Sequence, residues 1–186
     1  MSKILSVAFA TLLVLAQGLA PARAADDGYT PEEIVAAATG FFGDTSEGLA
    51  TIIEKVFGEL GQPNAYIAGE EASGAFFFGL RYGRGTLNRK AGGSMPVYWQ
   101  GPSIGWDVGG NASKSFVLIY GLKSVDDIFV RFPGGEGTIY FVAGVAANYQ
   151  QNGDIVLVPI RTGVGLRAGV NVGYQHYTRE PSVNPF

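Results

Sequence analysis

Arginine and aromatic side chains gather in the middle of the 186-residue sequence and offer its clearest candidate chemistry. Arg81 and Arg84 flank Tyr82 in a glycine-rich stretch, and Trp99 and Trp106 follow in the next segment. A guanidinium can meet two oxygens of a carboxylate or phosphate at once, and aromatic rings add cation–π contacts. This pattern indicates a binding site for an anionic or polysaccharide ligand. The alternative is a solvated hairpin tip whose aromatic residues belong to the core.

The alternation of side chains along a strand divides the residues of this candidate site between two faces. Successive side chains of a strand point to opposite faces, so Tyr82 and Arg84 share one face and Arg81 lies on the other. We expect Tyr82 and Arg84 to make the main contacts, with one of the two tryptophans as an apolar wall. The glycines on either side of Arg84 leave its approach open.

Carboxylates offer a second kind of chemistry, the hydrolysis of a glycan. Such an enzyme needs two carboxyl groups that flank the scissile bond. Asp107 follows a tryptophan beside glycines, and Asp126 and Asp127 follow a capping serine. Asp107 or Asp127 would be the acid of this enzyme, although acids are also favoured in the first turn of a helix. Two carboxyl groups that converge in one cleft would decide for the enzyme.

The composition removes most other catalytic and metal chemistry. The chain has no cysteine and one histidine, His176, so it has no thiol nucleophile and no histidine-rich metal site. Residues 163–169 imitate a dinucleotide-binding loop, but the alternation continues as a strand through Tyr174 instead of opening a helix. We therefore expect no cofactor, no bound metal and no catalytic residue.

The first 24 residues are typical of a secretory signal peptide. Lys3 supplies a basic start, residues 4–15 an apolar run, and Ala22-Arg23-Ala24 a cleavage site of the small-x-small type. The run is short for a hydrocarbon core of ~30 Å, so we expect no transmembrane anchor after cleavage. These features predict export to a Gram-negative periplasm. We divide the chain into a signal peptide (1–24), a helical segment (25–63) and a β-barrel domain (64–186).

Charge is unevenly distributed along the mature chain. Without the signal peptide, the chain contains 11 basic and 16 acidic residues. Ten of those acids lie in residues 25–71 beside one base, whereas residues 72–186 carry ten bases and six acids. An acidic front and a basic body indicate internal docking or two faces with different partners. The overall acidity and the secretory address argue against a nucleic-acid partner.

Two helices are expected before residue 64. Thr30-Pro31-Glu32-Glu33 combines an N-cap, a proline at the first helical position and a capping-box glutamate, and we expect this helix to end near Gly40. A second helix is expected over residues 49–60, where apolar residues recur at helical spacing. Its polar face is acidic, so we expect its apolar stripe to pack on the sheet of the same chain and not on a membrane surface.

From residue 64 the apolar period becomes two and glycine becomes frequent. Strands are expected over residues 75–87, 97–100, 104–109, 116–120, 138–149, 155–160 and 164–174. An Asn152-Gly153 turn predicts a hairpin, and Pro159 points to an edge or a bulge. We expect a mainly β fold: a small Gly-rich antiparallel β-barrel of about seven or eight strands, with the two N-terminal α-helices packed on it over one opening.

Three stretches of the sequence match motifs of a known family. They are AFFFGLRYGRGTL at residues 75–87, VYWQGPSIGWD at 97–107 and VLIYGL at 117–122. Together they resemble a proteobacterial family of secreted proteins, one branch of which is named envelope integrity protein A. The resemblance covers nearly the whole mature chain. It implies a soluble periplasmic β-barrel that supports the cell envelope, with no established catalytic residues to transfer.

A more distant and segmental resemblance is to SYLF lipid-binding domains. It rests on Gly83-x-Gly85 and on the run of residues 102–109. This resemblance implies contact with lipid through glycine-rich and basic segments, which would place Arg81 and Arg84 in the candidate site.

The sequence as a whole favours a periplasmic, non-enzymatic protein that supports cell-envelope integrity and stress resistance by binding an envelope lipid or polysaccharide. One alternative is an envelope glycan hydrolase that uses Asp107 or Asp127. A second is an eight-stranded integral outer-membrane barrel, which a C-terminal Phe186 permits. The proline-containing, non-alternating end at residues 182–186 and the preceding helices weigh against this second alternative.

Cleavage of the signal peptide is directly testable. We expect exported protein to begin at Ala25 or within two residues of it, because Ala24 completes the cleavage site. Intact mass of the protein released from the periplasm measures this. A mass that still includes residues 1–24 would contradict the periplasmic location.

Overall fold

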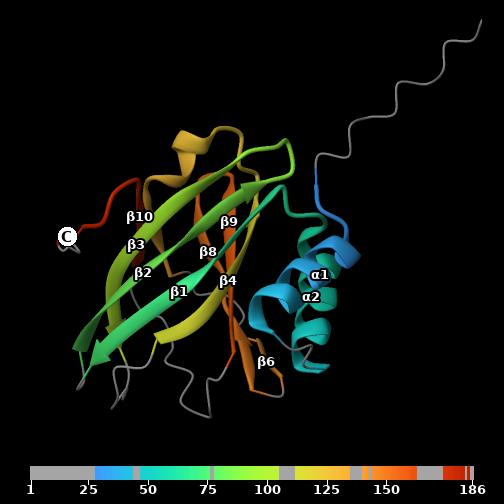
Figure 1. Ribbon diagram of the computed structural model, residues 1–186, viewed down its shortest axis with the longest axis horizontal. Coiled ribbons are helices and arrows are strands. Elements are labelled where there is room, and N and C mark those ends of the chain that lie inside the picture. The colour runs from blue at the N-terminus through green and yellow to red at the C-terminus, as the bar shows by residue number, and fades with distance from the viewer. Residues whose placement is uncertain are drawn as a thin grey trace, which may run out of the picture.

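The computed structural model of the chain describes residues 28–43, 47–75, 78–104, 112–134, 140–142, 144–162, 174–182 and 184. In these residues two helices precede an antiparallel sheet (Figure 1). The elements are α1 (Pro31–Phe42), α2 (Glu47–Leu60), β1 (Ala65–Ala75), β2 (Phe78–Arg89), β3 (Ser94–Ile104), β4 (Ala112–Tyr120), the 3-10 helix η1 (Val125–Ile128), β5 (Arg131–Pro133), β6 (Tyr140–Val142), β7 (Val145–Ala147), β8 (Gln150–Asn152), β9 (Ile155–Thr162) and β10 (Tyr174–Thr178).

The strands curl into a barrel-like wall. Its order is β5, β10, β3, β2, β1, β4, β9 and β8, and each neighbouring pair is antiparallel. One backbone bridge, from Gly134 after β5 to Gln150 in β8, joins the two ends of this wall. Beside it, the Asn152 side chain donates a hydrogen bond of 2.7 Å to the Arg131 carbonyl. The predicted antiparallel barrel with two N-terminal helices packed on it is confirmed.

Helix α1 owes its ends to two local signals. In the predicted capping box, Glu33 N donates to Thr30 Oγ1 at 3.3 Å and Thr30 N donates to Glu33 Oε2 at 2.8 Å. The helix ends at Gly43, whose φ of 86° is the left-handed conformation of a helix C-cap. This end lies two to three residues beyond Gly40, near which it was predicted. In the described part of the chain, no helix is both long enough and apolar enough to cross a membrane.

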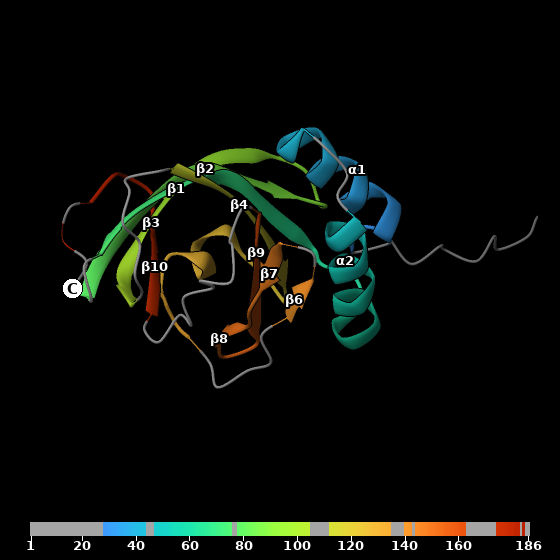
Figure 2. The same ribbon diagram turned by 90° about the horizontal axis from the view of Figure 1, so that it is seen from below.

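Both helices pack on the outside of the wall. Their fully buried apolar residues are Ile34, Ala38, Leu49, Ile52, Ile53 and Val56, and these share one core with outward-facing residues of β4, β7 and β9. The predicted packing of the α2 stripe on the sheet is therefore confirmed. The prediction that the helices cover an opening was wrong (Figure 2). The outward side chains Phe116, Leu118 and Ile160 form an apolar surface on the side of the barrel, and the apolar face of α2 packs against it.

A second core fills the barrel interior and closes one end of it. Inward-facing residues such as Ile67, Val117 and Leu157 pack there, and Ile128 of η1 is buried against them. The short 3-10 helix, and not α1 or α2, therefore covers this opening. Its cap is a Ser124–Asp127 capping box, in which Ser124 N donates to Asp127 Oδ2 at 2.9 Å.

Several strand boundaries differ from those expected. β1 was not predicted, because alanine, glycine and two glutamates hide its alternation. β3 contains the strand expected over residues 97–100 and is longer at both ends, and the strand expected over 104–109 lies, except for Ile104, outside the described residues. The expected strand over 138–149 is a hairpin of β6 and β7, which turns at Gly144 with a φ of 83°. Residues 163–173 of the last expected long strand lie outside the described residues.

Pro159 interrupts a ladder, as its lack of an amide hydrogen requires. β9 pairs with β7 through residues 160–162 and with β8 through residues 155–157. Both pairings have the same register. The gap between them therefore lies at Val158 and Pro159 of β9, where neither β7 nor β8 pairs with β9. The predicted hairpin is also present: Asn152 pairs with Ile155 across a two-residue turn in which Gly153 has a φ of 58°.

Three inward-facing glycines make room for one large side chain. Trp99 is 1% exposed, and its indole lies inside the barrel against β1 and β2. A Cβ at Gly83 would overlap the indole, and one at Gly69 would lie 2.7 Å from its Cη2. Gly85 faces Gly69 across the same strand pair, where the two backbones approach closely. The glycine-rich sequence around Arg84 therefore serves the interior of the barrel.

Replacing Gly83 with alanine tests this packing. We expect Gly83→Ala to destabilise the fold by about 1–3 kcal/mol, because the added methyl overlaps the buried indole. Gly58→Ala is the matched control: nothing lies within 4 Å of its Cβ position in α2, so it should stabilise by about 0.5–1 kcal/mol. Urea unfolding measures both. An unchanged Gly83→Ala midpoint would contradict the packing of Trp99.

Candidate binding sites

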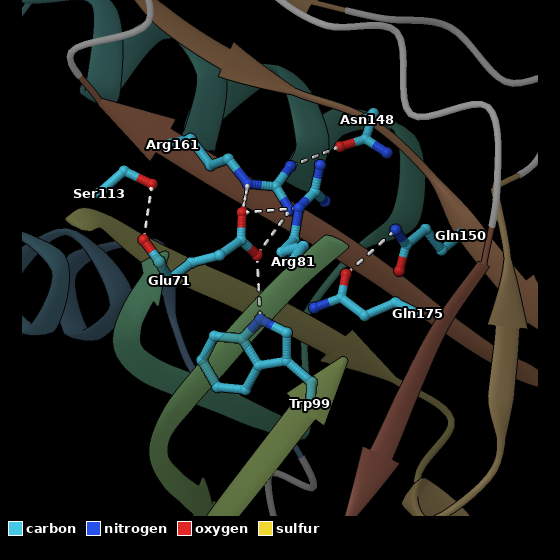
Figure 3. Close-up of polar contacts among 8 residues, drawn as sticks. All are labelled: Glu71, Arg81, Trp99, Ser113, Asn148, Gln150, Arg161 and Gln175. Atoms are coloured by element: carbon cyan, nitrogen blue, oxygen red, sulfur yellow. Dashed lines mark hydrogen bonds and ion pairs between the residues drawn. The ribbon is translucent and has the colours of Figure 1, made fainter. Parts of the chain in front are cut away.

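The polar half of the barrel interior is organised around the carboxylate of Glu71. Its Oε1 lies 3.0 Å from Arg81 Nε and 3.3 Å from Arg161 Nε. Its Oε2 accepts hydrogen bonds from Trp99 Nε1 at 2.9 Å and from Arg161 Nη2 at 3.4 Å. Four strands, β1, β2, β3 and β9, thus meet at one carboxylate (Figure 3). We call Glu71, Arg81, Trp99 and Arg161 the interior cluster.

Glu71 is buried at the centre of the interior cluster and stays charged. The Glu71 side chain is 4% exposed, and those of its arginine partners 12% and 13%. Burial alone would raise the pKa of Glu71, but the charges of Arg161 and Arg81 and the Trp99 hydrogen bond outweigh burial and hold that pKa below its ordinary value. A carboxyl group held in this way is a poor proton donor, so the cluster organises the interior.

Further polar side chains line the wall around this cluster. Gln150 Nε2 donates to Gln175 Oε1 at 3.2 Å, which links β8 to β10. Asn148 Oδ1 accepts a hydrogen bond of 3.3 Å from Arg161 Nη1. Ser115 lies opposite Arg161 in the register of β4 and β9, and Tyr177 lies opposite Trp99 in that of β10 and β3. Ser115, Gln150, Gln175 and Tyr177 are all buried.

The structure separates the residues that the sequence grouped into one site. Arg81 and Trp99 lie together in the interior cluster, whereas Tyr82 and Arg84 point to the outside of β2, as strand alternation predicts. Trp99 therefore cannot be the apolar wall beside Arg84; Tyr98 of β3, which pairs with Arg84, lies next to it on the outer face. Trp106 lies outside the described residues.

The outer face of β2, β3, β10 and β5 carries its own row of side chains. Tyr82, Gln100, His176 and Arg131 are successive partners across these strands, which lie about 4.7–4.9 Å apart. Arg84 and Tyr98 occupy the adjacent row. We call Tyr82, Arg84, Tyr98, His176 and Arg131 the outer patch; Gln100, between Tyr82 and His176, is 1% exposed and does not belong to it. Figure 2 shows β3 and β10 away from the side of the ring that α1 and α2 cover.

Charge and aromatic contacts shape the outer patch. Arg84 is exposed, and no carboxylate of the described residues forms an ion pair with it, although Glu70 is its strand partner. The Arg131 guanidinium lies 5.3 Å above the ring of Tyr174. Partial burial and the charge of Arg131 lower the pKa of His176, so this histidine is neutral at neutral pH. The face thus offers guanidinium, phenol and imidazole groups.

The carboxylates of the glycan-hydrolase alternative do not meet in the described structure. The Asp127 carboxylate caps η1, and Asp126 pairs with Arg179 on the surface. Asp107 lies outside the described residues. Among the residues that the structure describes, Glu71 is the only buried carboxylate, and no cluster of three His, Cys, Asp or Glu residues could hold a metal ion.

Sequence reasoning missed the centre of the interior cluster. Glu71 and Arg161 were not singled out, because each stands alone in its segment and becomes significant only when β1 and β9 face each other. One signal was present: the inward positions of β1 run Ala65, Ile67 and Gly69, so period two places Glu71 on the same buried face. A charged residue at an inward position indicates a buried ion pair.

The fold and the two sites define a class of protein: an antiparallel β-barrel-like wall with two helices on one side and an ion-paired carboxylate inside. The family model described as Envelope integrity protein A matches residues 27–186, so the chain belongs to that family. The predicted family resemblance is thereby confirmed.

The chain is also similar to a solved structure, a crystal structure of a β-barrel-like, uncharacterized protein from Brucella abortus. The two are 49% identical, the match covers 86% of this chain and 99% of that chain, and the TM-score is 0.78. Comparison with curated proteins finds no match. The resemblance to SYLF domains stays a prediction.

Replacing Glu71 with glutamine tests the interior cluster. We expect Glu71→Gln to destabilise the fold by about 2–4 kcal/mol at pH 7, because two largely buried guanidiniums lose their counter-charge. The folded pKa lies below the unfolded value of about 4.3, so charged Glu71 stabilises the fold above that pH. This contribution is lost as the pH falls through the folded pKa. Denaturant unfolding from pH 7 to pH 3 should show a smaller acid-dependent loss in Glu71→Gln than in wild type.

Asp154→Asn is the control for this prediction. Asp154 forms an ion pair of 2.8 Å with Lys123, and both side chains are more than three-quarters exposed. Exposed pairs contribute little to stability, so this variant should unfold like wild type at both pH values. A Glu71→Gln variant as stable as wild type at pH 7 would contradict the role of the cluster.

Proposed function

We propose that this protein supports cell-envelope integrity as a non-enzymatic periplasmic protein that binds an anionic envelope glycan on its outer patch. Membership of the envelope integrity family supports the envelope role. The binding proposal rests on one observation, the exposed guanidinium of Arg84, which forms no ion pair with the residues that the structure describes and lies beside aromatic and polar side chains. Guanidinium suits the carboxylates and phosphates of such glycans, because it can donate two parallel hydrogen bonds to one anion.

The composition of the outer patch favours a glycan over an acyl chain. Its members are phenol, guanidinium and imidazole groups, which hydrogen-bond and stack on sugar rings. In the described part of the chain, the large apolar residues that are strongly exposed are Leu80 and Val130, each 37% exposed. Two scattered residues do not make the contiguous apolar surface that acyl chains need. A lipid head group shares the phosphate chemistry, so the experiment distinguishes the two sources.

The packing of the helices supports a periplasmic protein over a barrel inserted in the outer membrane. An inserted barrel presents an apolar outer band to lipid. Here α1 and α2 cover the apolar outer side chains of β4 and β9, and Arg84 and Arg131 lie on the outer face of other strands. The capping role of Asp127 and the ion pairs of Glu71 support a role without catalysis.

Binding by Arg84→Ala and Lys123→Ala proteins tests the proposal. The probes are polysaccharide released by mild acid from the cell's own lipopolysaccharide, and vesicles of phosphatidylethanolamine and phosphatidylglycerol. We expect wild type to bind the polysaccharide and Arg84→Ala to bind it roughly tenfold more weakly, the loss of one charged hydrogen-bond pair. Lys123→Ala removes the same charge from an exposed ion pair elsewhere and should bind like wild type.

Three results would overturn the proposal. Binding to the vesicles alone would identify a lipid head group instead of a glycan. Equal binding by the wild-type and Arg84→Ala proteins would remove the outer patch as the site. A folded Arg84→Ala protein that fully restores envelope resistance to a deletion strain would separate the patch from the envelope role.

A further inference from the structure

Arg131 and His176 lie directly opposite each other on the outer face of the sheet. They are register partners of β5 and β10, so their Cβ atoms are about 4.5–5.5 Å apart. Arg131 is exposed and His176 is half-buried. The Arg131 guanidinium lies 5.3 Å above the ring of Tyr174, which shares the outer face of β10 with His176. We call Arg131, Tyr174 and His176 the β5–β10 subsite.

No acidic side chain of the described residues balances the charge of this subsite. Neither Arg131 nor His176 forms an ion pair with a carboxylate in the described part of the chain. The outward residues around His176 on the same and the neighbouring strands are Tyr98, Gln100, Pro102, Arg131, Pro133, Tyr174 and Thr178. None of them is acidic, and the titratable groups among them are the guanidinium and two phenols.

This arrangement disfavours a charged histidine in the protein without ligand. Like charges directly opposite each other on neighbouring strands repel. Partial burial and the charge of Arg131 accordingly lower the pKa of His176. An anion that contacts both side chains would reverse the balance, because an opposite charge nearby favours the protonated imidazole.

We propose that the β5–β10 subsite is a second anion site of the outer patch and takes up a proton on His176 when it binds an anionic group. This inference rests on the proposed glycan binding and deepens it. It gives the ligand at least two anionic groups, one at Arg84 and one at Arg131. It also makes binding tighter in an acidic medium than in a neutral one.

The hydrogen-bonding groups of histidine explain why the proton accompanies the anion. A neutral imidazole has one N–H donor and one acceptor nitrogen, whereas an imidazolium has two donors and no acceptor. An anion only accepts hydrogen bonds, so it matches the charged ring. Affinity should therefore rise as the pH falls through the pKa of His176 in the complex and level off below its pKa in the free protein. Each unit between these two pKa values corresponds to a roughly tenfold tighter complex.

The position of the subsite requires a ligand longer than one anionic group. β3 lies between β2 and β10, so two strand spacings, about 10 Å, separate Arg84's strand from His176's. Arg131 lies one strand further along. The sheet curves between β2 and β10, as Figure 2 shows, so side chains on its outer face diverge. A chain of sugars with repeated anionic groups can follow this surface and contact both guanidiniums.

A pH titration of the histidine ring by NMR tests the inference directly. The chain contains one histidine, so in mature protein without a histidine tag the imidazole C–H signals belong to His176. The probe is the polysaccharide released by mild acid from the cell's own lipopolysaccharide. We expect a midpoint below the ordinary value of about 6.5 in the free protein, and one about a unit higher with polysaccharide.

Affinities at pH 7.5 and pH 5.0 show whether this proton strengthens binding. Wild type should bind the polysaccharide roughly tenfold more tightly at pH 5.0. His176→Asn should show no such gain, and His176→Lys, whose charge is permanent, should bind at pH 7.5 about as tightly as wild type at pH 5.0. Arg84→Ala is the matched comparison: it should bind more weakly at both pH values and keep the tenfold ratio. Thermal unfolding checks that each variant is folded.

Three results would overturn the inference. They are a His176 midpoint that the polysaccharide does not raise, a gain at pH 5.0 that His176→Asn retains, and a folded His176→Lys protein that binds no more tightly than wild type at pH 7.5. Binding that Arg84→Ala weakens but pH does not change would leave the proposed function standing without the second site. Absence of polysaccharide binding at both pH values would overturn both.

Discussion

The interior of this barrel depends on one buried carboxylate. Glu71 binds two guanidiniums and an indole; Arg81 and Trp99 come from the next two strands, and Arg161 comes from β9, 90 residues away. A buried charge is costly unless it is paired and hydrogen-bonded, so removal of any partner leaves the others exposed to that cost. The register of β1 against β2 and of β4 against β9 is therefore tied to this group. A shift of one residue would turn Glu71 to the outside and an outward residue to the interior.

The size of neighbouring side chains makes this arrangement possible. An indole can reach from β3 to Glu71 on β1 only because β1 and β2 carry glycine where it passes. These glycines do not interrupt the pairing of β2 with β1 and β3. Tyr82 and Arg84 therefore lie on the outer face of a regular strand. The two candidate sites thus share one strand and use opposite faces of it, Arg81 inside and Arg84 outside.

Local signals in the sequence were sufficient for much of the fold. The capping box at Thr30, the apolar stripe of α2 and the turn at Asn152 each act within a few residues, and the structure contains all three. β1 escaped detection because its buried face includes glycine and glutamate, whose presence is explained by partners on other strands. Gly83 and Gly85 suggested an open approach to Arg84, whereas the indole that requires them lies on β3. Side chains that meet through long-range pairing leave no local pattern, so the interior cluster required the structure.

The closure of the wall gives the barrel a preferred line of opening. β1 and β2 share eleven pairs of residues, and so do β2 and β3, whereas among the described residues the first strand of the wall meets the last through one backbone bridge, Gly134 to Gln150, and one side-chain hydrogen bond, Asn152 to Arg131. Local opening takes place where the fewest hydrogen bonds must break. The barrel is thus better described as a curled sheet whose two edge strands are joined by few hydrogen bonds than as a continuously paired barrel. Gln150 belongs both to this bridge and to the polar interior, so the closure of the wall and its polar lining depend on the same residue.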